Sequence, residues 1–335
     1  MKVRGIMMSA VILSGPFASS AWAAEKITVG ALRFTSHAAN FVAYEKGYFA
    51  DAGLDVEFKF FQAAQPMALA IASGDVDFGL TAISGGLISL ADKGAVKVIG
   101  GALQEEGGID GQMILASKAA YDAGLKTPAD LKGHSFGVTT AGSSFHYMAH
   151  KIADKEGFER KDIKVRPLQK VGAVIGALKS AQIDAWAIVP HIAKGLGKAP
   201  QVEVIGNVSD YIPNYQVTTV FTSTKNTTNN PELVKTFLSA YSKGAADFNA
   251  ALVDKTEGDA TADDMVKLIH KYVYADRPLE KAAPSIQNGA MRLNAGAALN
   301  MASVEDQLNW FKSERLVPSG VTLDKLVDSR FVETF

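Results

Sequence analysis

Apolar residues along the chain change repeatedly between strand spacing and helix spacing. A β-branched apolar run at residues 26–32 predicts a strand, and apolar residues at helical spacing follow at 40–49. Further segments of the same two kinds predict strands at 54–61, 76–80 and 96–103, and helices at 67–73 and 83–93. Strands joined by helices of this length form right-handed βαβ units, so we expect a parallel sheet.

The alternation of strands and helices starts again after residue 130. It predicts strands at 131–140, 163–168, 183–189 and 202–205, and helices at 143–156 and 171–181. Residues 112–117 and 217–223 are expected to be two strands that connect this second unit to the first. From Pro231 onward the pattern is helical, and these helices are expected to return to and cover the first unit. We therefore predict a first lobe of residues 24–112 and 221–335, and a second lobe of residues 113–220.

The first 23 residues have the order of a secretory signal peptide. Lys2 and Arg4 precede a mostly apolar stretch at 6–17, and Ala21-Trp22-Ala23 has the A-x-A pattern of a cleavage site. An uncleaved anchor helix or a buried first helix is the alternative. With no cysteine for lipid attachment, we expect residues 1–23 to be removed and the rest to be soluble in the periplasm.

Composition excludes several classes of function. The chain has 34 Lys+Arg and 35 Asp+Glu; without Lys2 and Arg4 the balance is 32 against 35, or −3, which is unlike a nucleic-acid-binding protein. The absence of cysteine excludes disulfides, thiolate zinc sites and cysteine nucleophiles. No later stretch offers about 20 uncharged apolar residues that would span a membrane.

Blocks in a fixed order carry a resemblance to a known family. They are FVAYEKGYFADAGLDVEFKFF (41–61), ALAIASGDVDFG (68–79), LKGHSFGVTTAGSSFHYMAHKI (131–152), ALKSAQIDAWAIVPH (177–191) and NNPELVKTFLSAYSKG (229–244). Together they resemble the periplasmic binding proteins for sulfonates, taurine, nitrate and thiamine precursors (the NMT1/THI5-like superfamily). The resemblance implies an α/β type II periplasmic binding protein fold, with two parallel-sheet-containing lobes joined by two crossing strands and a helical C-terminal segment on the first lobe. It also implies an inner-membrane permease with ATPase subunits as partner.

In open α/β sheets, ligands bind in the loops at the carboxyl ends of strands. Three such loops are at residues 33–37, 81–84 and 139–144. In the last, Gly142 permits a close approach of the backbone, and Ser143 or Ser144 caps the next helix or helps its free N–H groups to hold an anion. An ordinary helix cap without a ligand is the alternative.

From these loops and the neighbouring strand ends we predict a ligand site. Arg33 is a candidate partner for an acidic group, His37 and His191 are candidate donors, and Phe34, Phe145 and Tyr215 are candidate walls for an aromatic ligand, although each also fits a surface or core role. The predicted site comprises Arg33, Phe34, Thr35, Ser36, His37, Thr81, Ala82, Gln112, Ser143, Ser144, Phe145, Pro190, His191 and Tyr215.

Three further residue patterns are assigned to structure. His146 and His150 are one helical turn apart, but no third ligand with suitable spacing is evident, so we expect packing or a supporting role and no metal. Asp75 and Asp77 have the spacing of a carboxylate pair, but we interpret them as aspartates of a tight turn that bind its backbone donors, and we interpret Asp184 in the same way.

These observations predict a monomeric binding protein without a cofactor. The favoured ligand is a small organic anion, such as a sulfonate, a taurine-like compound or an aromatic carboxylate, buried between the lobes by hinge closure. A neutral pyrimidine-like ligand is the alternative, and so is a sensor module for a membrane kinase. An enzyme is not expected, because the cysteine motif of the related pyrimidine synthases is missing and neither G-x-S-x-G nor H-E-x-x-H occurs.

Overall fold

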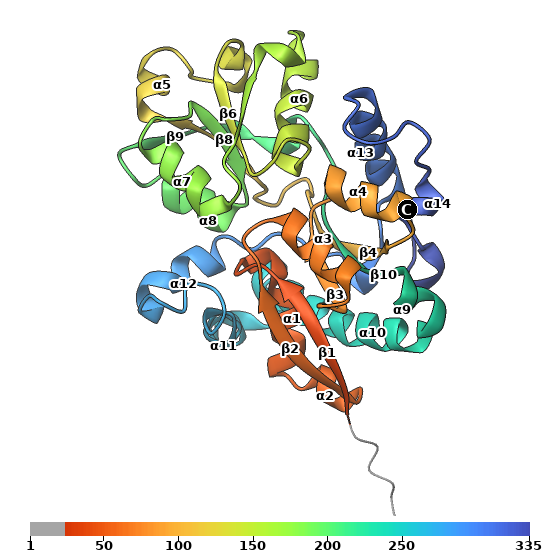
Figure 1. The fold of residues 1–335 in the computed structure, drawn as a ribbon. Helices are drawn as coiled ribbons and strands as arrows, with labels where there is room; N and C mark the ends of the chain where they lie inside the picture. Colours follow the sequence, from red (N-terminus) through yellow and green to blue (C-terminus); the bar gives the residue numbers. More distant parts are fainter. Residues whose placement is uncertain (1–23) are drawn as a thin grey trace, which may run out of the picture.

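The computed structural model describes residues 24–335, so the predicted signal peptide lies outside the described residues. Two five-stranded sheets form the centre of the molecule, one above the other in Figure 1. No helix in the described part of the chain is long and apolar enough to cross a bilayer.

The first sheet has the strand order β2-β1-β3-β10-β4. β1 runs parallel to β2 and β3, whereas β10 runs antiparallel to both of its neighbours, β3 and β4. The strands are β1 (Glu25–Ala31), β2 (Leu54–Phe60), β3 (Phe78–Thr81), β4 (Val96–Gln104) and β10 (Gln216–Ser223).

The second sheet repeats this plan with the order β7-β6-β8-β5-β9. β6 runs parallel to β7 and β8, and β5 runs antiparallel to β8 and β9. The strands are β5 (Met113–Ser117), β6 (Ser135–Val138), β7 (Lys164–Pro167), β8 (Ala185–Ile188) and β9 (Val202–Asn207). Below, the first lobe means the first sheet with the helices packed on it, and the second lobe means the second sheet with its helices.

Helices follow the strands in both lobes, as the change of apolar spacing predicts. In the first lobe they are η1 (Thr35–His37), α1 (Ala38–Glu45), α2 (Tyr48–Asp51), α3 (Ala64–Ser73) and α4 (Gly85–Asp92). In the second lobe they are α5 (Lys118–Asp122), η2 (Pro128–Leu131), α6 (Ser144–Glu156), η3 (Arg160–Asp162), α7 (Val171–Lys179), α8 (Pro190–Leu196) and η4 (Val208–Asp210).

The C-terminal segment is helical, and it contacts both lobes. α10 packs on α1, and α14 packs on α4 and β4, so this part covers the first lobe as expected. In addition, α12 packs on α8 and α13 packs on α6, both in the second lobe (Figure 1). The elements are α9 (Thr224–Asn229), α10 (Pro231–Phe248), the π-helix η5 (Asn249–Val253), α11 (Gly258–His270), α12 (Leu279–Gln287), η6 (Ala295–Ala297), α13 (Met301–Ser313), α14 (Leu323–Leu326) and η7 (Ser329–Phe331).

The two expected connecting strands are full members of the sheets. β5 pairs with β8 and β9, and β10 pairs with β4 from Gln216 to Ser223. The predicted boundary at 112/113 therefore falls directly before β5, whereas the predicted boundary at 220/221 falls inside β10. The links between the lobes are the segments that precede β5 and β10.

Candidate functional site

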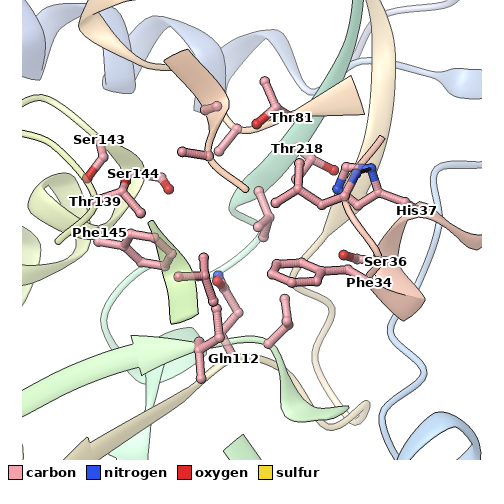
Figure 2. Close-up of a pocket in the computed structure, with 18 residues that line it drawn as sticks. Phe34, Ser36, His37, Thr81, Gln112, Thr139, Ser143, Ser144, Phe145 and Thr218 are labelled. Atoms are coloured by element: carbon pink, nitrogen blue, oxygen red, sulfur yellow. Dashed lines mark hydrogen bonds between the residues drawn. The ribbon is translucent and has the colours of Figure 1, made fainter. Parts of the chain in front are cut away.

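A cavity of about 60 Å³ lies between the two sheets, at the ends of strands from both lobes (Figure 2). Backbone hydrogen bonds across the junction lie near it, from Gly85 N–H to the Gly142 oxygen (2.9 Å) and from Val171 N–H to the Gln62 oxygen (3.4 Å). The lobes therefore touch at its rim. The lining residues are Leu32, Phe34, Ser36, His37, Ala63, Ala64, Thr81, Ala82, Gln112, Thr139, Ser143, Ser144, Phe145, Val171, Ile188, Val189, Val217 and Thr218.

Two phenylalanines face the cavity from opposite lobes. Figure 2 shows the rings of Phe34, from the first lobe, and Phe145, from the second, on opposite sides of the space. Phe34 meets the ring of His191 at a centroid distance of 5.2 Å, and Phe145 meets that of Trp186 at 5.5 Å. Both rings are thus supported from behind, and the space between them is suited to a small apolar body.

His37 supplies a donor from the first lobe. It follows β1 in the short helix η1, and its Nδ1 accepts the Leu32 N–H at 3.3 Å. Burial lowers the pKa of His37 to about 3, so the ring is neutral near pH 7. A neutral imidazole whose Nδ1 is an acceptor carries its proton on Nε2. His37 therefore presents an N–H donor at the cavity wall.

The second lobe presents the beginning of α6. Ser143 occupies the N-cap position but makes no capping bond with its side chain, and its buried Oγ has no partner among the described residues. The first amides of a helix, here those of Ser144 and Phe145, have no acceptor within the helix. Gly142, at φ +74°, makes the turn that directs this helix end at the cavity. Hydroxyls and amides here form a donor set for an anion or another acceptor group.

Two further donors come from the segment before β5 and from strand β10 of the first sheet. Gln112 precedes β5 and Thr218 lies in β10, and both line the cavity. The Gln112 Nε2 and Thr218 Oγ1 atoms are buried and have no hydrogen-bond partner among the described residues. An unpaired buried polar group costs about 1–3 kcal/mol. A ligand that accepts hydrogen bonds from these atoms would recover that free energy.

Nine of the fourteen predicted site residues line the cavity: Phe34, Ser36, His37, Thr81, Ala82, Gln112, Ser143, Ser144 and Phe145. Arg33 does not. Its guanidinium lies 3.7 Å from the centre of the Phe60 ring and donates to the Tyr272 oxygen. The candidate partner for an acidic ligand is therefore directed along the surface of the first lobe, because the strand-end residue before Phe34 faces outward.

The structure places the other four predicted residues behind the cavity wall. Thr35 is buried but does not reach the cavity, and Tyr215 is fully buried with its ring 5.4 Å from that of Tyr147. Pro190 begins α8, and the helix turns His191 away from the cavity toward Tyr274 and Gly289. Neither ring nitrogen of His191 has a partner among the described residues, and burial lowers its pKa to about 3.

Sequence reasoning missed nine lining residues. Val171, Ile188 and Val189 follow or end strands of the second lobe, and Thr218 lies in a strand that was expected only to connect the lobes. Strand ends were therefore the available signal. The others are Leu32, Ala63, Ala64 and Val217, together with Thr139, which lies in the predicted ligand loop 139–144 but is not one of the fourteen predicted site residues.

A curated relative from Brucella abortus (strain 2308), named only as a binding protein, is 29% identical over 212 residues. The alignment covers 63% of this chain and 62% of the relative's length.

Solved structures with a similar fold are much further away in sequence. The alkanesulfonate-binding protein SsuA from Xanthomonas axonopodis pv. citri, bound to MOPS, superposes with a TM-score of 0.71 at 17% identity, over 91% of this chain and 98% of that one. The periplasmic nitrate-binding protein NrtA from Synechocystis PCC 6803 gives 0.71 at 13% identity, over 90% and 86%. These similarities establish the fold, which is that of the periplasmic binding proteins, as the resemblance in the sequence implied.

The family model described as NMT1/THI5 like matches residues 34–251, which include most of the cavity wall and both connecting strands. The chain therefore belongs to the NMT1/THI5-like family.

Proposed function

We propose that this protein is the solute-binding component of an ABC-type importer and holds a small molecule between its lobes. The cavity carries the proposal, because both lobes and the segment before β5 line it and because it contains buried donors without a partner among the described residues. In such a site, the open form binds the solute on one lobe and closure brings the second set of donors to it. Proteins of the same fold that bind sulfonate or nitrate support this function.

The ligand we propose is a small aromatic anion, a single-ring carboxylate or sulfonate. Its ring would lie between Phe34 and Phe145, and its acid group would meet the start of α6, with Ser143 and Ser144 as hydroxyl donors (Figure 2). Among residues 24–335, no carboxylate side chain lines the cavity to repel an anion. No described Lys or Arg lines it either, so the hydroxyls and the helix end would have to hold the charge, and the Nε2–H of His37 would meet the other end of the ligand.

A neutral pyrimidine-like ring is a second candidate for the same site. The uncharged wall favours it, because a neutral ligand loses less hydration free energy on burial than an anion. The Gln112 amide would then pair with a ring carbonyl. Whichever of the two ligands it binds, we propose that the protein is periplasmic, that its partner is a permease with ATPase subunits, and that it binds the ligand without chemical turnover.

Thermal unfolding with a panel of small molecules tests the proposal. The panel contains benzoate, benzenesulfonate, taurine, nitrate and thymine, each followed by calorimetric titration where the midpoint moves. A ligand at one hundred times its dissociation constant adds about 2.7 kcal/mol to the free energy of unfolding. We expect benzoate or benzenesulfonate to raise the midpoint most, and a shift with thymine alone would favour the neutral candidate.

Matched variants then locate the site. Ser143→Ala and Phe145→Ala should each weaken binding several-fold, whereas Arg33→Ala should leave it unchanged because that guanidinium contacts Phe60 and Tyr272. Equal affinity of the Ser143→Ala and Phe145→Ala variants and the unaltered protein would exclude this cavity. Conversion of any bound compound to a product would contradict the assignment as a binding protein.

A further inference from the structure

A chain of polar contacts lies directly behind the helix end that faces the cavity. The Gly142 N–H donates to His146 Nδ1 at 3.1 Å, and the Nε2 atoms of His146 and His150 are 3.0 Å apart. On the far side, His150 Nδ1 lies 3.5 Å from Oε2 of Glu314, just after α13, close to the carboxylate but without a hydrogen bond to any described residue. The chain thus leads from the turn beside Ser143 to the C-terminal segment.

The direction of the protons in this chain is fixed at one end. A backbone N–H can only donate, so Nδ1 of a neutral His146 is the acceptor and its proton is on Nε2. His150 Nε2 must then accept, which places the proton of His150 on Nδ1, on the side of the Glu314 carboxylate. Burial lowers the pKa of both histidines, that of His146 to about 4, so both are neutral near pH 7.

The surroundings keep the chain in place. The Trp310 ring packs edge-on against both imidazoles, at centroid distances of 5.2 Å to His146 and 5.6 Å to His150. Arg160 donates to Glu314 Oε1 at 2.6 Å and is held by Asp154 on α6. The Glu314 carboxylate is therefore anchored to the second lobe independently of the histidines.

The turn at Gly142 is also a contact between the lobes. Its oxygen accepts the Gly85 N–H at the start of α4, while its own N–H is occupied by His146. The next residue is Ser143, which lines the cavity and whose buried Oγ has no partner in the part of the chain that the structure describes. These two bonds fix the peptide groups on either side of Gly142, and their orientation determines where Ser143 Oγ and the first amides of α6 point.

We propose that His146 is a positioning residue of the ligand site: through its bond to Gly142 and the chain to His150 and Glu314, it holds the start of α6 so that the donors of Ser143, Ser144 and Phe145 face the cavity. The predicted effect on ligand binding rests on the proposed function. The hydrogen bonds of His146 and His150 can also be tested without a ligand. His146 does not line the cavity and touches no bound molecule in this role.

Histidine tautomers give the ligand-independent test. In long-range ¹H–¹⁵N spectra of the full chain at pH 7.5, His146 should be protonated on Nε2 and His150 on Nδ1. Amide exchange at Gly142 should become at least tenfold faster in His146→Leu. His146→Asn should restore slow exchange, because Asn Oδ1 stands near the place of Nδ1 and accepts the same bond. The opposite tautomers, or unchanged exchange in His146→Leu, would overturn the chain.

Titration with benzenesulfonate tests the effect on the site. We expect His146→Leu to bind at least tenfold more weakly, His146→Asn to bind as the unaltered protein does, and His270→Asn, on α11, to serve as a neutral control. Equal affinity of His146→Leu and the unaltered protein would reject the positioning role and leave the proposed function standing. If benzenesulfonate does not bind, the same titration is made with benzoate. If the unaltered protein binds neither compound, the proposed ligand class fails, and the histidine tautomers and the amide exchange of Gly142 alone test the chain of contacts.

Discussion

The two lobes share a scaffold but present different chemistry to the cavity. Both sheets have the same spatial order of strands. Three parallel strands come first, an antiparallel strand (β10 or β5) is fourth, and an edge strand (β4 or β9) is fifth. In both, the aspartate after a helix accepts a backbone N–H from the first strand: Thr28 N–H to Asp77 at 2.8 Å, and Ser135 N–H to Asp184 at 2.7 Å. The two partners are 49 residues apart in each lobe. This repetition indicates that the aspartates belong to the scaffold.

At the cavity the lobes differ in how they use a histidine. In both, an imidazole Nδ1 accepts a nearby backbone N–H, from Leu32 in the first lobe and from Gly142 in the second. The first leaves Nε2–H of His37 at the cavity wall, whereas the second directs Nε2–H of His146 away, to His150. The second lobe therefore offers a helix end and hydroxyls in place of a ring donor. A ligand that fits both lobes therefore needs different chemical groups at its two ends.

The largest effect we expect is a loss of stability in acid, because each lobe buries a neutral histidine. Burial lowers the pKa of His37 and His191 to about 3, so as pH falls from 6.5 the unfolded chain takes up protons before the folded one does. Stability is therefore present above about pH 6.5 and is lost as pH falls toward 3. Each pKa unit corresponds to about 1.4 kcal/mol, so we expect a loss of several kcal/mol, measured by urea unfolding between pH 7 and pH 4.

Glu105 provides the control for that measurement, because its effect has the opposite sign. Burial raises its pKa to about 7, so the folded state holds a proton that the unfolded state has released above pH 4.5. Its contribution is present below pH 4.5 and is lost as pH rises through 7. Glu105→Gln should therefore steepen the loss in acid, while His37→Asn and His191→Asn should each flatten it. A flat profile in the unaltered protein would contradict the burial of both histidines as neutral rings.

Substitutions at two glycines should distinguish the packing of the first lobe from the contact between the C-terminal segment and the second lobe. A Cβ at Gly244 on α10 would stand 2.3 Å from the Ala39 oxygen, inside the first lobe. A Cβ at Gly289 would stand 2.2 Å from the Cβ of His191, where the C-terminal segment meets the second lobe. Overpacking costs about 1–3 kcal/mol. We expect Gly244→Ala to lower the unfolding midpoint with ligand affinity kept.

Gly289→Ala should do the reverse, weakening the binding of the ligand found in the panel more than it lowers the midpoint. The clash lies between the second lobe and the C-terminal segment, so the lobes can avoid it by staying apart. Small-angle scattering should show a larger radius of gyration for this variant than for the unaltered protein. Loss of the same stability in both variants, with equal radii, would mean that the His191 contact belongs to the folding core.

Much of the fold was predictable, because the spacing of apolar residues and the Gly and Pro residues that end helices and strands are local features of the sequence. The strand expected at residues 54–61 is β2, the helix expected at 143–156 is α6, and the helix after Pro231 is α10. The expected functions of Asp77 and Asp184 were correct in kind, although each carboxylate binds a donor of a neighbouring strand and not one of its own turn. Pairing between strands depends on distant residues, which one local pattern cannot reveal.

The lining of the candidate site was predictable at its loops but not in the direction of its side chains. Phe34 and Arg33 are adjacent in one loop, yet only Phe34 faces the cavity. Arg33 is directed instead at Phe60 on β2 and at Tyr272, which is 239 residues away in the chain. The helices α12 and α13 reach the second lobe for the same reason: their partners are set by three-dimensional packing, which helical spacing alone does not encode.

The smallest expected effect is a difference between the two scaffold aspartates. Asp77 binds the Thr28 N–H with its carboxylate, whereas Asp184 binds both the N–H and the hydroxyl of Ser135, and His134 lies 3.5 Å away. Burial alone would raise the pKa of Asp184, but the Ser135 bonds and His134 lower it overall. Asn keeps one carbonyl acceptor, so Asp77→Asn should cost about 1 kcal/mol or less, and Asp184→Asn somewhat more because the charge-assisted bonds are lost. Urea unfolding at pH 7 measures both, and the Asp184→Asn deficit should shrink below the ordinary pKa of the carboxyl group. A larger cost for Asp77→Asn would show that the first lobe depends on its carboxylate for something that the repeated scaffold does not explain.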